Sequence, residues 1–338
     1  MNVAVNRQIV LAARPVGLPR IADFQLAYAT LPSPLAGEVL VRVLYLSLDP
    51  YMRERMNAAG PYAEPIALGD VMIGGGVGFV LESGDAAFKV GDAVEGMLGW
   101  QEYAVARAGN LRKLDLSLAP ISAALGVLGM PGLAAYFGLL DVCAPKKGET
   151  VVVSAAAGAV GMVAGQIAKL RGCRVVGIAG SGAKVAWLID ELGFDAAWNY
   201  KVGNDFDGKL KALCPEGVDV YFDNVGGAIS DAVMQHINSR ARVSVCGQVS
   251  QINLESPESG PRWFERLIAK QATVRGFLVA GYADRFADGC AELTRWLTAG
   301  ELKYREDVAQ GIESAPQAFI GMLQGRNEGK QLVQVSNL

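Results

Sequence analysis

A glycine-bearing turn between two apolar stretches is the part of this sequence best suited to bind a charged cofactor. Residues 151–153 are three valines, which suit a strand buried on both faces. Residues 155–161 then turn the chain into a helix, and residues 174–179 form a second apolar strand. Gly158 would let the backbone approach a pyrophosphate, and Gly161 would let the helix pack closely on the strand. The order of strand, turn, helix and strand predicts one βαβ unit.

The turn departs from the G-x-G-x-x-G pattern because Ala156 stands at the first glycine position. A glycine turn by itself could be a plain tight turn. The complete βαβ context favours dinucleotide binding, with N–H groups at the helix start facing the phosphates.

The end of the second strand indicates which dinucleotide would bind. An NAD site usually carries Asp or Glu there. In this chain no acidic residue occurs between the end of that strand and Asp190. Ser181 and Lys184 leave room for a 2′-phosphate and supply a charge, and Tyr200, expected near the start of the third strand, could add a hydroxyl. Lys184 could instead be an ordinary solvated lysine. The missing acid favours NADP(H).

Metal and thiol chemistry are poorly supported. Catalytic zinc needs Cys, His and carboxylate ligands around an open position. The chain has one histidine, His236, on a helix expected at residues 229–237, and its first cysteine is Cys143. Cys246 follows an expected buried strand, and no base stands beside it in the sequence. We therefore expect no metal and no Cys–His nucleophile.

The bulk composition describes a well-cored globular chain. Its 338 residues predict two domains, and it is 51% hydrophobic and 19% charged. A net charge of −3 gives no reason to expect a nucleic acid or membrane partner. We expect no membrane-spanning helix and no signal peptide. The five cysteines are scattered and odd in number, which favours reduced thiols in the cytoplasm.

The pattern along the chain changes near residue 127. Before it, short strands with Gly and Pro turns predict a small barrel-like β domain without a strong helix. After it, strands and helices alternate, which predicts an α/β domain with a doubly wound parallel sheet. Ligands bind such sheets at the carboxyl ends of the strands, so Asn224, the turn after Cys246 and residues 277–279 should face one crevice. The expected elements are helices at 125–136 with a break, 229–237 and 315–323, and strands at 37–43, 73–81, 101–105, 218–223, 242–247, 273–279 and 331–335.

Six stretches spread over nearly the whole chain carry a family resemblance. The sequence resembles the medium-chain dehydrogenase/reductase superfamily, and within it the zinc-independent group of prostaglandin (leukotriene B4 dehydrogenase-type) reductases, plant double-bond reductases and bacterial curcumin reductases. The matching stretches are LDPYMR at 48–53, LGMPG at 128–132, the turn at 155–161, FDNVGG at 222–227, CGQVSQ at 246–251 and GRNEGK at 325–330.

The resemblance implies an enzyme, a fold and a set of site residues. The reaction is hydride transfer from NADPH to the β-carbon of an α,β-unsaturated ketone or aldehyde, followed by protonation of the enolate. The fold is a Rossmann domain over 128–304 and a GroES-like β barrel over 1–127 and 305–338, in a cytoplasmic homodimer paired through the sheet edge. Tyr51 becomes a catalytic candidate. The implied cofactor residues are Gly158, Ala159, Val160, Gly161, Ser181, Lys184, Tyr200, Asn224, Cys246, Gly247, Gln248, Val249, Ser250, Gln251, Ile252, Phe277, Leu278, Val279 and Asn327.

Two positions depart from the family pattern. Ile252 stands where many relatives have a tyrosine proposed to contact cofactor and substrate oxygen, and Gly75 stands where plant members have another. Isoleucine cannot donate a hydrogen bond. The pocket should be roomier, and Tyr51, Tyr282 or the ribose 2′-OH would have to stabilise the oxyanion.

Bland interpretations compete with these assignments. Residue types alone would make Tyr51 part of a surface turn with ion pairs. Four aromatic residues could wall the substrate or simply lie in the core, namely Trp263, Phe264, Phe277 and Tyr282. The alternative functions are an NADPH-dependent quinone oxidoreductase and a non-catalytic dinucleotide-binding protein.

Overall fold

The computed structural model describes residues 5–59 and 64–336. The chain divides into two compact units. The first unit contains Met1–Gly126 and Glu306–Leu338, and the second contains Val127–Arg305.

The first unit is built around the long strand β3 (Glu38–Ser47). Its sheet has the order β14-β15-β3-β4-β5-β7, β6 also pairs with β3, and β1 and β2 form a separate two-stranded sheet. Among the described strands of this unit, only β14 and β15 pair in parallel. The strands are β1 (Val5–Leu11), β2 (Phe24–Thr30), β4 (Gly75–Ser83), β5 (Ala93–Met97), β6 (Tyr103–Arg107), β7 (Arg112–Lys113), β14 (Glu306–Gln310) and β15 (Lys330–Gln334); the helices are η1 (Ile21–Asp23), α1 (Tyr51–Arg55), η2 (Ala108–Asn110), η3 (Ile121–Leu125), η5 (Ile312–Ser314) and α9 (Ala315–Leu323).

An aromatic group organises the core of this unit. The Trp100 ring stacks on Phe24 with centroids 5.8 Å apart and meets Phe319 of α9 edge-on at 5.5 Å. Trp100 and Phe319 are fully buried. The C-terminal segment thus completes the core of the N-terminal β domain, because α9 and β15 supply one side of it.

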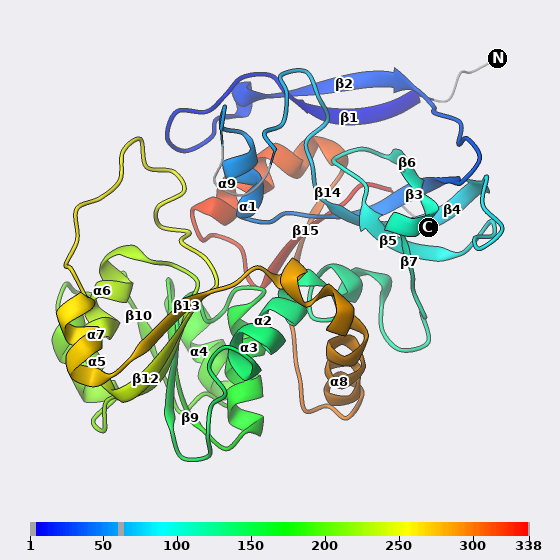
Figure 1. Cartoon of the computed structure of the whole chain (residues 1–338). Coiled ribbons are helices and arrows are strands. Elements are labelled where there is room, and N and C mark those ends of the chain that lie inside the picture. Colours follow the sequence, from blue (N-terminus) through cyan, green and yellow to red (C-terminus); the bar gives the residue numbers. More distant parts are fainter. Residues whose placement is uncertain (1–4, 60–63, 337–338) are drawn as a thin grey trace. The chain divides into compact units, whose positions relative to one another are not determined.

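The second unit is a six-stranded parallel sheet with the order β10-β9-β8-β11-β12-β13 (Figure 1). Every residue of β8 (Thr150–Val153) is buried, as a central parallel strand requires. The other strands are β9 (Arg174–Ala179), β10 (Ala196–Asn199), β11 (Val218–Asp223), β12 (Ile237–Val245) and β13 (Thr273–Gly276); the helices are α2 (Met130–Leu140), α3 (Gly161–Leu170), α4 (Gly182–Asp190), α5 (Phe206–Leu213), α6 (Gly227–Gln235), α7 (Phe264–Lys270), η4 (Val279–Arg285) and α8 (Phe286–Thr298).

Helices cover this sheet on both faces. Leu210 of α5 and Val233 of α6 pack with Val152 and Val176 on one face. On the other face α2 packs against α3 and α8 (Figure 1). The α/β fold class, with a parallel Rossmann-type sheet and an N-terminal β domain, is therefore confirmed.

Several predicted element boundaries are wrong. The helix expected at 229–237 ends at Gln235, and Ile237 begins β12, where it pairs with Val218. Ile237 continues the helical spacing of Ile229 and Val233, so the local pattern cannot reveal that sheet pairing takes it. The strand expected at 273–279 ends at Gly276, before η4.

Other elements were not predicted at all, among them β1, β2, β14 and α8. β10 ends at Asn199, so Tyr200 follows the end of the third strand rather than its start. No helix within the described ranges is both long and apolar enough to cross a membrane. All five cysteines are free thiols.

Candidate functional site

The turn between β8 and α3 leaves no room for a side chain at Gly161. A Cβ there would lie 2.8 Å from Cα of Ala156 and closer still to the carbonyl oxygen of Ala155. The left-handed residue of the turn is Ala155, with φ +46°, whereas Ala156 has an ordinary negative φ. Alanine is therefore tolerated at the first glycine position of the motif. The turn brings the N-terminus of the ten-residue helix α3 to the carboxyl edge of the sheet, where its first N–H groups lack intrahelical acceptors.

Asp223, at the end of β11, holds three loops at this edge together, and sequence reasoning assigned it no role. The carboxylate is buried and accepts hydrogen bonds from Ser154 Oγ at 3.1 Å and Tyr221 Oη at 2.8 Å. Its remaining donors are the backbone N–H groups of Val225 and Gly226, Ser230 Oγ and Gln248 Nε2. The only sequence signal for this role was its place at the carboxyl end of an expected strand.

Asn224 and the loop after Cys246 are fixed against each other beside this carboxylate. Asn224 donates from its backbone N to Ser154 Oγ at 2.9 Å and from Nδ2 to Ser154 O at 2.8 Å. The backbone N–H of Cys246 donates to Asp223 O, and that of Ser250 donates to Val225 O. Burial, helped by the Asp223 charge, raises the pKa of the Cys246 thiol to about 12, so this side chain is a neutral thiol at pH 7.

The end of β9 forms a small notch without an acid. A Cβ on Gly180 would lie 3.2 Å from the Tyr200 ring, 3.5 Å from its hydroxyl and 3.4 Å from Cε of Lys201. Ser181 caps α4 by accepting a hydrogen bond from the backbone N–H of Lys184 at 3.2 Å. We call Gly180, Tyr200 and Lys201 the Gly180 notch. Lys201, absent from the predicted set, is exposed, and its Nζ lies 5.9 Å from the Tyr200 ring centre.

The segment after β13 carries two aromatic side chains that meet each other. The Phe277 ring fills the space left by Gly138, where a Cβ would lie 2.7 Å from the ring's Cε1 atom. Tyr282 meets Phe277 edge-on, with centroids 6.3 Å apart. The idea of one four-residue aromatic wall is wrong, because Phe264 is 77% exposed and Trp263 packs beside α6, donating to Asp231.

Tyr51 and Asn327 belong to the first unit. Tyr51 is half-buried at the start of α1, and Asp49 and Arg53 beside it are buried, so this is not a surface turn. Burial, reinforced by the charge of Asp49, raises the pKa of Tyr51, so its hydroxyl stays protonated at neutral pH. Asn327 donates from Nδ2 to Gly329 O at 2.7 Å, within its own turn.

A buried ion pair fixes the segment that leads into Tyr51. Lys330 of β15 is only 1% exposed, and its Nζ donates to Leu48 O at 2.7 Å and to Asp49 Oδ1 at 2.8 Å. Ser47 Oγ donates to the other Asp49 oxygen. The ammonium of Lys330 and both carboxylate oxygens of Asp49 thus have hydrogen-bond partners. Buried charges require such partners.

Metal-ligand geometry does not occur in the described part of the chain. No three His, Cys, Asp or Glu side chains there are grouped closely enough to hold an ion. His236 caps the end of α6 rather than lying within it, and its Nε2 lies 2.9 Å from Asp207 Oδ1.

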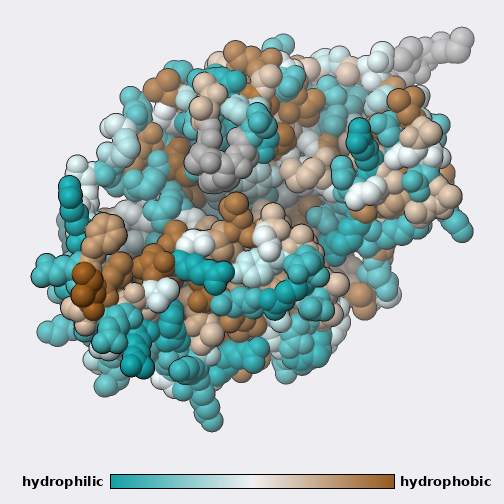
Figure 2. Space-filling view, in the orientation of Figure 1, coloured by the Kyte–Doolittle hydropathy of each residue, from teal (hydrophilic) through white to brown (hydrophobic). Residues whose placement is uncertain are grey.

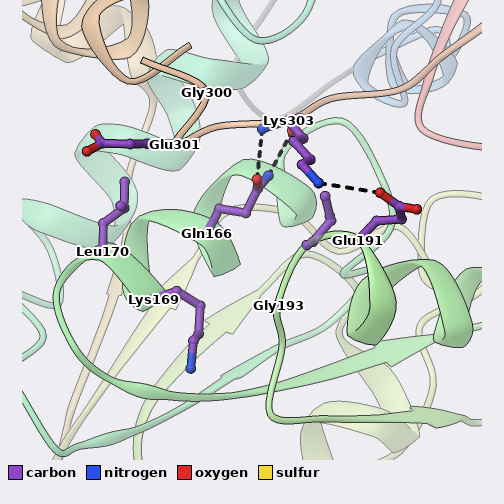
Figure 3. A pocket seen from close by; sticks show the side chains of 9 residues that line it. Gln166, Lys169, Leu170, Glu191, Gly193, Gly300, Glu301 and Lys303 are labelled. Carbon is purple, nitrogen blue, oxygen red and sulfur yellow. Dashed lines mark hydrogen bonds and ion pairs between the residues drawn. The ribbon is translucent and has the colours of Figure 1, made fainter. Parts of the chain in front are cut away.

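A hollow of about 300 Å³ lies beside the C-terminal half of α3 (Figure 3). Its charges are compensated, since Lys303 pairs with Glu191 and Lys169 pairs with Asp195. Gln166 uses its amide to bind the backbone of Lys303 in both directions. These hydrogen bonds attach α3 to the segment around Lys303. None of the residues that line the hollow belongs to the predicted site.

A doubly wound sheet with this turn, combined with an N-terminal β domain, defines a dinucleotide-dependent oxidoreductase. Two family models match the chain: "N-terminal domain of oxidoreductase" over residues 7–114 and "Zinc-binding dehydrogenase" over residues 159–295.

Similar proteins narrow this class. The chain is 52% identical over 336 residues to the protein of Bacillus subtilis (strain 168) named "Putative NADP-dependent oxidoreductase YfmJ", covering 99% of both chains. It is 46% identical over 336 residues to the 2-alkenal reductase (NADP(+)-dependent) of Nicotiana tabacum, covering 98% of both. The crystal structure of CurA in complex with NADPH from Vibrio vulnificus superimposes with a TM-score of 0.93 at 47% identity, covering 98% of this chain and 100% of that one. The chain belongs to the medium-chain dehydrogenase/reductase superfamily, in its zinc-independent group of prostaglandin, curcumin and plant double-bond reductases.

Proposed function

We propose that this protein is an NADPH-dependent reductase of the carbon–carbon double bond of α,β-unsaturated aldehydes and ketones. The cofactor would supply a hydride to the β-carbon. The chain would bind and orient both reactants and stabilise negative charge on the substrate oxygen.

The Gly180 notch is the observation that carries the choice of NADPH. An aspartate at Gly180, as an NAD site would have, would place its Cβ 3.2 Å from the Tyr200 ring, so the ring would have to shift by a few tenths of an ångström. Lys201 and the hydroxyl of Tyr200 converge on the same point, where a 2′-phosphate would find a cation and a donor. The notch thus suits a phosphate and disfavours the acid that binds a free ribose 2′-OH.

The remaining cofactor contacts follow from the carboxyl edge of the sheet. We propose that residues 158–161 hold the pyrophosphate and that Ser181 and Lys184 lie beside the 2′-phosphate. Asn224 and the loop 246–252 would face the nucleotide and nicotinamide, together with residues 277–279. We propose that Asn327 also contacts the cofactor.

The reduction itself is supported by the related 2-alkenal reductase and by Tyr51. An alkenal is an α,β-unsaturated aldehyde, and an enone presents the same polarised double bond. Tyr51 keeps its proton at neutral pH, so its hydroxyl is a hydrogen-bond donor suited to a developing oxyanion. We propose that Tyr51 supplies this donor to the substrate oxygen.

We also propose a homodimer that pairs through β13. β13 is the last strand of the sheet, and all four of its residues are exposed. An unprotected edge strand can pair with another strand, here β13 of a second copy. Apolar side chains cluster beside it: Phe264 is 77% exposed and Ile268 of α7 is 78% exposed, and Figure 2 shows hydrophobic atoms gathered over α7. Light scattering should give twice the monomer mass; a monomer at micromolar concentration would contradict the pairing.

The free cysteines support a reducing compartment. Cys143, Cys173 and Cys214 are buried thiols, with pKa values raised by burial to about 12, about 11 and about 11. We propose the cytoplasm, which fractionation of cells producing the protein would test.

Initial-rate oxidation of NADPH and of NADH tests the proposed function. An enal, an enone and a quinone are supplied separately, with a chelator present throughout. Selective, chelator-insensitive oxidation of NADPH with the enal or enone, giving the saturated carbonyl compound, is expected. Turnover with the quinone alone would replace the proposal by a quinone oxidoreductase. Tight NADPH binding without turnover of any of the three would indicate a dinucleotide-binding protein without this chemistry.

A further inference from the structure

The hydroxyl of Tyr282 is buried and has no hydrogen-bond partner among the described residues. Buried hydroxyls in proteins are normally satisfied, and an unsatisfied one weakens the fold. Tyr221, in the same unit, shows the usual arrangement, because its hydroxyl donates to Asp223 Oδ1 at 2.8 Å and lies 3.0 Å from Ser230 Oγ. The Tyr282 hydroxyl therefore needs a physical explanation.

Aromatic packing holds the Tyr282 ring in place. The ring stacks on Phe137 with centroids 4.6 Å apart and an interplanar angle of 10°. Phe137 is fully buried, and Phe277 meets Tyr282 edge-on. Rotating the tyrosine toward another acceptor would break the stack, so the direction of the hydroxyl is fixed by the fold.

The position of this hydroxyl points to a ligand. Tyr282 lies in η4, six residues beyond the end of β13, on the side of the sheet where strands end and ligands bind. Phe277, against which it packs, is one of the residues proposed to line the nicotinamide. Asn253, in the loop after the adjacent strand β12, has a buried Oδ1 that also lacks a partner. Buried polar atoms without a partner thus occur in both of the loops that we propose to line the nicotinamide.

We propose that Tyr282 Oη donates a hydrogen bond to the carbonyl oxygen of the unsaturated substrate and stabilises the enolate. The inference rests on the proposed reduction. A hydride from the nicotinamide adds its electron pair to the β-carbon, the double-bond pair shifts toward the carbonyl carbon, and the carbonyl π pair moves onto oxygen. Tyr282 keeps its proton throughout. The α-carbon then takes a proton from water, and the hydroxide left behind is neutralised by buffer.

This role assigns the donor that Ile252 cannot provide. In this chain the donor would lie in the segment after β13, whereas in many relatives it would be the tyrosine at the position of Ile252, in the loop after β12.

Tyr282→Phe tests the assignment, because it removes the hydroxyl and keeps the stacked ring. We expect kcat for an enone to fall on the order of 10²–10³-fold, the usual effect of losing one oxyanion donor. NADPH affinity, measured by fluorescence titration, should be unchanged. The melting temperature should stay the same or rise by about 2–4 °C, because an unsatisfied buried hydroxyl has been removed.

Tyr136→Phe is the matched control. Tyr136 belongs to the same aromatic group, with its ring 5.0 Å from that of Phe137, but it has no proposed role. This control variant should keep wild-type kcat.

The outcomes separate this inference from the function on which it rests. Failure of the wild type to reduce any enal or enone refutes the proposed function. Reduction by the wild type with full kcat in Tyr282→Phe refutes the inference alone. A fall in kcat matched by a similar fall in Tyr136→Phe, or accompanied by a lower melting temperature, would make Tyr282 a structural residue and would also overturn it.

Discussion

Replacing Lys330 with methionine should destabilise the first unit strongly. Lys330 and Asp49 are 281 positions apart in sequence, yet their Nζ and Oδ1 atoms lie 2.8 Å apart in a buried setting. Methionine fills most of the lysine volume but leaves the Asp49 carboxylate buried with Ser47 as its remaining side-chain donor, and it leaves Leu48 O without its donor.

The expected loss follows from the burial of both partners. Lys330 is 1% exposed and Asp49 is 6% exposed, so water cannot replace the missing cation. Removing one partner of such a pair costs about 3–5 kcal/mol. For a unit of this size the melting temperature should fall by roughly 10 °C. The Tyr51 segment, which begins two residues after Asp49, should lose its fixed position, so kcat should fall while NADPH affinity changes little.

The assay is thermal and denaturant unfolding of four proteins: wild type, Lys330→Met, Asp49→Asn and the double variant. The double variant removes the uncompensated charge and should recover more than half of the stability that Lys330→Met loses. A loss below about 1 kcal/mol, typical of an exposed pair, would refute the reasoning.

Three further predictions concern the turn after β8, the Gly180 notch and a half-buried acid. Gly161→Ala should lower both the melting temperature and NADPH affinity, because its Cβ collides with the rigid Ala155 backbone; equal affinity for NADPH by titration would contradict this. Lys201→Met should lower the preference for NADPH over NADH in kcat/KM about tenfold, while the exposed control Lys209→Met should leave the preference unchanged. Burial raises the pKa of Glu306 despite opposing effects of neighbouring groups, so the native state favours its protonated form and loses that contribution as the pH rises above about 4. Glu306→Gln should therefore gain stability relative to the wild type as the pH rises from about 4; a difference in melting temperature that stays constant from about pH 4 to neutral pH would show that the acid does not titrate with folding.

The sequence by itself determined the elements whose signals are local. The valines of β8, the glycine turn and the spacing of Val163 and Ile167 predicted a strand and helix that the structure contains. Strand β9 and helix α9 have the predicted bounds. The absence of an acid after β9 and the six matching stretches could also be recognised from the sequence, because recognising them needs only residue types at fixed spacings.

Only the tertiary structure decided which distant residues meet. Asp223 joins Ser154 and Gln248 through contacts that no local period encodes. Ile237 fits a helix by its spacing but pairs with Val218, because a buried strand gains more from the sheet than from one extra helical position.

The pairing of Lys330 with Asp49 and the stacking of Tyr282 on Phe137 were likewise out of reach. Each depends on packing between segments far apart in the chain. Close packing fixes where a side chain points and whether its polar atoms find partners, and that decides which hydroxyl remains available to a ligand.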